Sequence, residues 1–134
     1  MREIKFRAKT KEHSKWVYGR YFKRYSPTEN FTMFSEFGEE RHCIESDGVV
    51  FEIDLDTLCE FTGSVDIDKN EIYENDIAAF VQDGKEKGLS KIVWFASSFN
   101  VVGINGHLAN WYLEEYSNSY RVIGNTIDNS ELIL

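Results

Sequence analysis

The amino-acid sequence predicts a mainly β protein, an all-β barrel or sandwich built from short antiparallel strands. The first observation is that several short segments alternate apolar and polar residues, which is typical of half-buried strands. The second is that turn signals such as Asp47-Gly48 and Asn105-Gly106 separate these segments. The third is the composition, 42% hydrophobic and 15% aromatic with one Pro in 134 residues, which favours a globular over a disordered chain. This length suits one domain, residues 1–134, or two small subdomains divided near residues 61–66.

The first strand is expected at residues 4–9, where apolar and basic residues alternate. Its apolar face holds Ile4, Phe6 and Ala8, and its basic face holds Lys5, Arg7 and Lys9. A turn at residues 11–14 would join it to an aromatic strand at residues 16–22, forming a hairpin. Residues 26–30 contain the Pro and predict a turn, and residues 31–37 predict a less regular third strand.

The Asp47-Gly48 pair predicts a hairpin between residues 41–45 and a strand at residues 49–56. Because acidic residues alternate with apolar ones in the second segment, we expect that strand to have an acidic outer face. The face consists of Glu52, Asp54 and Asp56. After a kink, residues 57–61 would continue the strand.

Residues 71–81 are open to two interpretations. Asp68 followed by Glu71 has the spacing of a helix capping box, and apolar residues in the segment share one helical face. Asn75-Asp76 is instead a turn candidate, which predicts a turn followed by a strand. Local pattern alone does not decide between them.

The C-terminal half contains further strand and turn patterns. A polar loop is predicted at residues 82–90, followed by strands at residues 91–95, 100–104, 108–113 and 120–123 and a terminal turn at residues 128–132. One common core is expected, because each of five residues lies on the apolar side of its segment. These residues are Phe6, Phe51, Ile53, Ile77 and Val122.

Asp66, Asp68 and Asn70 have the spacing that opens a calcium-binding EF-hand loop. Glu71 stands where the loop needs Gly, and Ile77 stands where it needs a bidentate Glu. We therefore interpret the segment as a solvated turn without a metal ion.

The two cysteines, Cys43 and Cys59, are expected to be reduced and packed, because the chain shows no export signal. With His42 they supply three soft ligands, whereas a structural zinc site needs four. No nucleotide-binding or nucleophile motif is present in the sequence. The sequence thus predicts no cofactor, no metal ion and no catalysis.

An aromatic-rich region follows residue 93. Its members are Trp94, Phe95, Trp111, Tyr112 and Tyr116. These side chains could line a groove for a peptide or a stacking platform for bases. Packing in the core is the interpretation that we favour, because aromatic residues dominate small cores.

Charge is distributed unevenly along the chain. Residues 1–24 carry nine basic and two acidic residues, a net charge of +7, and the remainder carries −15 to give the total of −8. The basic N-terminal hairpin is therefore predicted to be an interaction surface, most simply for an acidic region of a second copy. Reversal of Lys5, Arg7 and Lys9 to Glu should then weaken self-association without preventing folding.

The N-terminal segment lacks the apolar core of a signal peptide, and no apolar stretch approaches the ~20 residues of a membrane span. We expect a cytoplasmic protein without a membrane partner.

The segment from Phe61 to Val81, FTGSVDIDKNEIYENDIAAFV, carries a family resemblance. The chain resembles the YopX family of phage and prophage proteins, whose members have a segment close to TGLKDKNGKEIYEGDIV. Further matches are residues 4–8 near the start and residues 122–125 near the end, while residues 24–50 match loosely. The chain departs from the family at Lys9, where Trp is usual, at Asn75, where Gly is usual, and at Ser130, where Pro is frequent.

The resemblance implies an SH3-like, mainly β barrel or roll, in a family without a defined activity. It favours the turn-and-strand interpretation of residues 71–81. We expect an accessory protein of a phage or prophage that binds an unknown protein partner or itself. A role with nucleic acid is the alternative, either through the basic strand or as an acidic decoy for a DNA-binding protein.

Overall fold

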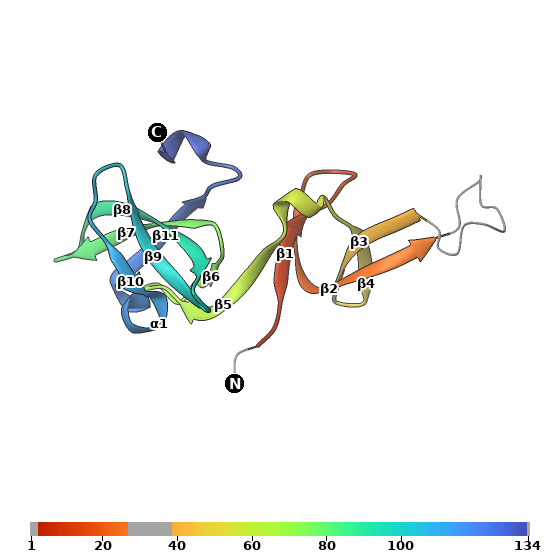
Figure 1. Ribbon diagram of the computed structural model, residues 1–134, viewed down its shortest axis with the longest axis horizontal. Helices are drawn as coiled ribbons and strands as arrows, with labels where there is room; N and C mark the ends of the chain where they lie inside the picture. Colours follow the sequence, from red (N-terminus) through yellow and green to blue (C-terminus); the bar gives the residue numbers. More distant parts are fainter. Residues whose placement is uncertain (1–2, 27–38, 134) are drawn as a thin grey trace. The chain divides into compact units, whose positions relative to one another are not determined.

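The computed structural model describes residues 3–26 and 39–133 and divides into two compact units (Figure 1). The N-terminal unit is Ile4–Cys59, and the C-terminal unit is formed mainly by Glu60–Leu134. The described strands are antiparallel and form two sheets, neither of which closes into a barrel. The mainly β prediction is confirmed, the closed barrel is not observed, and the SH3-like expectation stays a prediction.

The N-terminal unit contains four strands in the order β4-β3-β2-β1. They are β1 (Phe6–Lys9), β2 (Trp16–Ser26), β3 (Glu39–Ser46) and β4 (Val49–Glu52). The predicted first hairpin is confirmed, with pairs running from Phe6 opposite Gly19 to Lys9 opposite Trp16. The turn and strand predicted at residues 26–37 lie almost wholly outside the described residues.

The hairpin predicted at Asp47-Gly48 is also confirmed. Ser46 pairs with Val49, and the two residues between them have positive φ values of 49° and 83°, as a type I′ turn requires. The backbone twist of such a turn matches the right-handed twist of the strands, so the Asp-Gly pair also fixes the pairing register of β3 with β4.

The prediction of an acidic face on a strand at residues 49–56 is wrong, because β4 ends at Glu52. Ile53 forms an isolated bridge with Thr10, and a 3₁₀ helix, η1, follows at Leu55–Thr57. Asp54 caps this helix by accepting a hydrogen bond from the Asp56 backbone N–H at 3.1 Å. The preference of Asp for helix N-caps ends the strand before Asp54 and Asp56 can continue its face.

The C-terminal unit holds a five-stranded sheet with the order β10-β9-β8-β7-β11, together with the β5–β6 pair. Its strands are β5 (Cys59–Val65, which begins at the end of the other unit), β6 (Glu71–Tyr73), β7 (Asp76–Gln82), β8 (Lys85–Phe95), β9 (Ser98–Ile104), β10 (Asn110–Tyr112) and β11 (Tyr120–Asn125). The helices are α1 (Leu113–Tyr116), η2 (Ser117–Ser119) and η3 (Ser130–Ile133). Within the described residues, no helix is long and apolar enough to cross a membrane.

Residues 71–81 form a turn between two strands, not a helix. Asn75 adopts the left-handed conformation with φ of 71°, which Asn tolerates better than most residues that have a Cβ atom. The buried carboxylate of Asp76 accepts a hydrogen bond from the Tyr73 backbone N–H at 2.7 Å. A left-handed residue at Asn75 is incompatible with a continuous helix, so the tertiary fold selects the turn.

The prediction of a polar loop at residues 82–90 is wrong, because most of this segment belongs to β8. Gln82 pairs with Lys85 across a turn at Asp83 and Gly84, and β8 already begins at Lys85. The side chains of residues 85–87 are exposed, which explains why the segment has the composition of a loop. Pairing with β7 across the Asp83-Gly84 turn makes it a strand despite that composition, and β9 joins on the other side from Leu89 onward.

Each unit has its own hydrophobic core, so the prediction of one common core is wrong. In the N-terminal unit, Ala8, Ile44 and Ile53 form the buried cluster, with Phe6 packed against it. The core of the C-terminal unit consists of Ile72, Ala78, Ile92, Phe99, Val101, Leu113 and Tyr120, with Phe80 and Val122 packed against them. Phe6 and Val122 therefore belong to different cores.

Candidate interaction surface

The aromatic residues singled out in the sequence form an exposed surface on the C-terminal unit. We call the set Trp94, Phe95, Trp111, Tyr112 and Tyr116 the aromatic surface. The exposed fractions of the five residues are 50%, 72%, 41%, 60% and 41% in that order. The prediction that they pack in the core is wrong, and the groove interpretation fits their positions.

Local geometry explains this exposure. Trp94 and Phe95 end β8, directly before a two-residue turn in which Ala96 and Ser97 have positive φ values of 51° and 64°. The turn is fixed by Asn100, whose Nδ2 donates to the Phe95 carbonyl oxygen at 3.0 Å. Strand ends have fewer neighbours than strand centres, so side chains at these positions stay at the surface.

The other aromatic side chains lie on β10 and α1. In the five-stranded sheet β10 lies at one edge, and it pairs with β9 through Trp111 opposite Val101 and Tyr112 opposite Asn100. All three residues of β10 are exposed. An edge strand with exposed aromatic side chains is a recurrent site of protein association.

Contacts with the core hold Trp94 and Trp111 in place. The ring of Trp94 packs edge-to-face on Phe99, with centroids 4.7 Å apart. Trp111 donates a hydrogen bond from Nε1 to Oη of the buried Tyr120 at 3.2 Å, and it contacts the Tyr116 ring at 5.5 Å between centroids. Because both indoles are anchored, little side-chain entropy is lost when a ligand covers them.

A groove of about 680 Å³ runs beside the aromatic surface. It is lined by Thr62, Gly63 and Ser64 of β5, by Trp94, Ser97, Ser98, Phe99 and Tyr112, and by Leu113, Glu114 and Glu115 of α1. A second hollow of about 390 Å³ shares Ser98, Tyr112 and Glu115 with it. Tyr112 therefore lines both hollows.

The β5 wall of the groove is an irregular stretch of strand. Phe61 pairs with Tyr73 and Val65 with Glu71, and the register shifts between them. Gly63 has φ of 86°, and Thr62 Oγ1 accepts a hydrogen bond from the Ser64 N–H at 3.2 Å. A bulge with Gly at positive φ is one of the standard ways to re-aim a strand beside a binding site.

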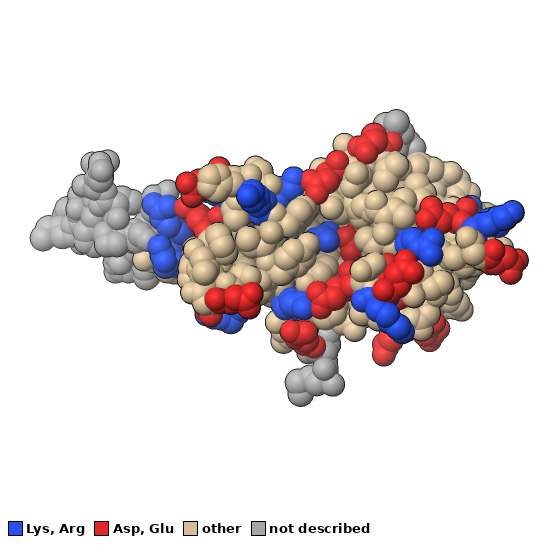
Figure 2. All heavy atoms as spheres, turned by 180° about the vertical axis from the view of Figure 1, so that it is seen from behind, with Lys and Arg blue, Asp and Glu red and all other residues tan. Residues whose placement is uncertain are grey.

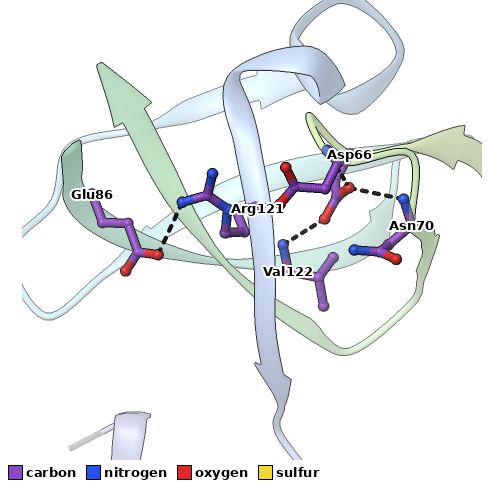
Figure 3. Close-up of polar contacts among 6 residues, drawn as sticks. Asp66, Asn70, Glu86, Arg121 and Val122 are labelled. Carbon is purple, nitrogen blue, oxygen red and sulfur yellow. Dashed lines mark hydrogen bonds and ion pairs between the residues drawn. The ribbon is translucent and has the colours of Figure 1, made fainter. Parts of the chain in front are cut away.

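The segment interpreted as a solvated turn contains a buried carboxylate, so that interpretation is wrong for Asp66. Its side chain accepts hydrogen bonds at 2.9 Å from the backbone N–H groups of Asp68, Asn70 and Val122 (Figure 3). The Asp-Asn spacing signals the turn, but nothing in the local sequence signals the distant bond to β11. No three His, Cys, Asp or Glu side chains gather into a metal-binding group within the described residues.

This turn also supports the aromatic surface. Ile67 donates from its backbone N–H to the Tyr120 carbonyl oxygen at 2.9 Å, and Tyr120 is the residue that binds the Trp111 indole. Arg121 next to it binds Asp68 at 2.7 Å. It also binds Glu86 at 3.4 Å (Figure 3). These two carboxylates, Asp68 first, raise the pKa of Arg121 above its usual value.

The basic face predicted on the first strand is not an open cationic surface. Arg7 is buried, and its guanidinium lies 4.7 Å from the centre of the Trp16 ring. Lys9 Nζ lies 5.6 Å from the same ring, and Lys5 is half-buried. Because Trp16 pairs with Lys9 across the hairpin, its ring draws two of the three cations toward itself. Reversal of Arg7 would therefore disturb folding as well as any surface.

The acidic residues predicted as partners of the basic face do not share one strand face, because Glu52 ends β4 whereas Asp54 and Asp56 belong to the cap and first turn of η1. Glu52 binds Arg41 at 2.9 Å and Lys11 at 3.5 Å, so it is neutralised within its own unit. On the face seen in Figure 2, Lys and Arg side chains lie beside Asp and Glu side chains. Counted over the sequence, nine basic and ten acidic residues give the N-terminal unit a net charge of −1, which leaves −7 for the rest of the chain.

The chain is similar to known proteins in its family and in its fold. The model of the family described as YopX protein matches residues 5–134. The chain belongs to the YopX family. For this YopX protein, the crystal structure of protein EF1440 from Enterococcus faecalis is similar over 100% of both chains, with a TM-score of 0.53 and 20% sequence identity. At this identity the likeness concerns the fold alone. No curated protein is significantly similar to the chain.

Proposed function

We propose that this YopX family protein is a phage or prophage accessory protein that acts in the host cytoplasm by binding a protein partner through its aromatic surface. The observation that carries the proposal is the exposure of five large aromatic side chains around two adjoining hollows. Trp and Tyr are enriched among the residues that dominate binding energy at protein interfaces. Burial of one such side chain contributes roughly 1.5–3 kcal/mol. The proposal requires no catalysis.

Affinity capture tests this proposal. The wild-type protein and a Trp94→Ser/Tyr112→Ser variant would be immobilised and exposed to lysate of a bacterial host. Leu108→Ser is the matched control, because Leu108 is 91% exposed but lies outside both hollows. We expect a stoichiometric partner that the control retains and the aromatic variant loses. Retention by the aromatic variant would contradict the proposed surface.

Self-association is the second form of this proposal. Sedimentation velocity of the same three proteins across salt concentrations tests it. An oligomer that dissociates in the aromatic variant would identify a second copy as the partner. A monomer under all conditions would exclude a second copy as the partner.

A role with nucleic acid is the alternative, and the net charge of −7 outside the N-terminal unit supports its decoy form. In that form the captured partner is a DNA-binding protein, and duplex DNA competes with the YopX protein for it. Direct binding of DNA through the basic hairpin has less support, because Arg7 and Lys9 lie against Trp16. A mobility shift at low salt that disappears at high salt would favour direct binding.

A further inference from the structure

The groove on the C-terminal unit combines two chemistries that both attract cations. Trp94 and Tyr112 line it with side chains that are at least half exposed. The face of an aromatic ring carries negative charge density, which attracts a Lys or Arg head group within about 6 Å of the ring centre. The same protein already uses this contact in its other unit, where Arg7 lies over Trp16.

Two carboxylates line the same groove. Glu114 and Glu115 are exposed residues of α1, directly after β10. No Lys or Arg is among the residues that line the groove. Among the residues that the structure describes, no basic side chain forms an ion pair with either of the two carboxylates. A cation from outside would therefore meet two uncompensated negative charges.

Charge distinguishes between two macromolecules that an aromatic surface can bind, a polypeptide and a single-stranded nucleic acid. A single-stranded nucleic acid would stack its bases on the rings but bring phosphates toward Glu114 and Glu115. A basic polypeptide places its side chains against the rings and its charge against the carboxylates. The charge of −7 outside the N-terminal unit adds a long-range attraction in the same direction.

We infer that the groove between Trp94 and Tyr112 binds a Lys or Arg side chain from a basic segment of the partner protein. The inference rests on the proposed function and specifies the chemistry of its ligand. The aliphatic stem of the bound side chain lies along the rings, and its charged end reaches Glu114 or Glu115.

The test uses the whole protein and synthetic peptides of alternating Lys and Gly. The comparison peptide carries acetyl-lysine at every Lys, which has nearly the same length but no charge. Binding is followed by titration of the Trp indole NMR signals, so that the site and the affinity are read together. We expect the Lys peptide to shift the Trp94 signal, and the acetylated peptide to bind at least about tenfold more weakly.

The variants separate local from long-range effects. Glu114→Gln/Glu115→Gln should weaken binding of the Lys peptide about threefold to tenfold. Asp83→Asn/Glu131→Gln is the matched control, because it removes the same charge from exposed residues that do not line the groove. The control should change the affinity less than twofold. An equal loss in the control would overturn the inference, since general attraction would then explain the binding.

Two further outcomes have defined meanings. Equal binding of the acetylated peptide, or a shift of the Trp94 signal by a single-stranded oligonucleotide and not by the Lys peptide, would overturn the cation site. Such a result leaves the proposed function intact if the aromatic variant still loses its captured partner. Retention of the partner by the aromatic variant instead contradicts the proposed function itself.

Discussion

The buried side chain of Asp66 connects its own turn to β11, a contact that no local sequence pattern indicates. Its carboxylate accepts three backbone hydrogen bonds, two within its own turn and one from Val122 on β11. Asp66→Ala removes the acceptor of three partly buried N–H groups and empties the buried site of the carboxylate, so we expect a loss of about 2–4 kcal/mol in unfolding free energy. Urea denaturation followed by far-ultraviolet circular dichroism measures it.

Asp68→Ala is the control for this prediction. Asp68 pairs with Arg121 at the surface, where its side chain is 48% exposed, and loss of such a pair costs less than about 1 kcal/mol. Equal losses in the two variants would show that burial of Asp66 is not what makes it important.

The ionisation of Glu74 should make the stability of the C-terminal unit depend on pH, in a direction that its pKa shift defines. Burial raises the pKa of its carboxyl group, a backbone hydrogen bond from Glu60 opposes the shift, and the Glu60 carboxylate adds to it. The folded state therefore holds the proton more tightly than the unfolded state, and stability falls as the pH rises through the folded pKa.

The variant Glu74→Gln lacks the titrating carboxyl group, so it should not show this loss of stability with rising pH. Because the side chain is only half-buried, we expect a gain of about 0.5 kcal/mol or less at neutral pH and none below about pH 4. Unfolding free energies measured from about pH 4 to pH 7 test it, with Glu131→Gln as an exposed comparison. A gain that is largest at acid pH would have the wrong sign and contradict the assignment.

Among the elements, β10 depends on a close approach of two backbone segments. Gly103 of β9 donates to the Ala109 carbonyl oxygen at 2.8 Å, and a Cβ atom at Gly103 would overlap the His107 carbonyl and the Ala109 nitrogen. Gly103→Ala should therefore displace the segment that leads into β10. We expect a loss of about 1–3 kcal/mol together with a shift of the Trp111 indole NMR signal.

For comparison, Gly84→Ala adds its methyl group in open space at a φ of 75°. Only the backbone conformation is then unfavourable, at a cost of about 1–2 kcal/mol. The Trp111 signal should stay in place. A shift there in both variants would show that the signal reports general loosening rather than the position of β10.

Turns with Asp-Gly or Asn-Gly pairs were the elements most readable from the sequence. Asp47-Gly48 and Asn105-Gly106 predict turns because few other residues accept positive φ. Residues 85–90 were missed because their polar composition lacks the apolar alternation of a strand, although Asp83-Gly84 is a local hairpin signal. Exposure of the aromatic surface was missed for a different reason, since the edge position of β10 is set by the order of the whole five-stranded sheet. Of the groove, the sequence singled out Trp94 and Tyr112 but not Glu114 or Glu115.

The whole molecule has a hydrophobic core in each of its two units, and this changes what a core mutation should do. Ile53 packs with Ala8 and Ile44 in the N-terminal unit, so Ile53→Asp should unfold that unit. Burial of an unpaired carboxylate there is prohibitively unfavourable. We expect backbone hydrogen-exchange protection to disappear from β1–β4 and to persist in β7, β8 and β9.

Val101→Asp is the reciprocal variant, because Val101 is fully buried in the core of the C-terminal unit. It should remove protection from β7–β9 and leave β1–β4 protected. Loss of protection throughout the chain in both variants would show that the units fold as one cooperative body.

The cysteines provide a chemical reporter for this behaviour. Cys43 and Cys59 are both buried and are not joined by a disulfide bond, and both belong to the N-terminal unit, with Cys59 as its last residue. A thiol becomes open to alkylation only when its surroundings unfold, so the rate of iodoacetamide labelling at Cys43, within β3, counts openings of the N-terminal unit. Peptide mass spectrometry that separates Cys43 from Cys59, the first residue of β5, would then give the opening frequency of that unit without any engineered probe.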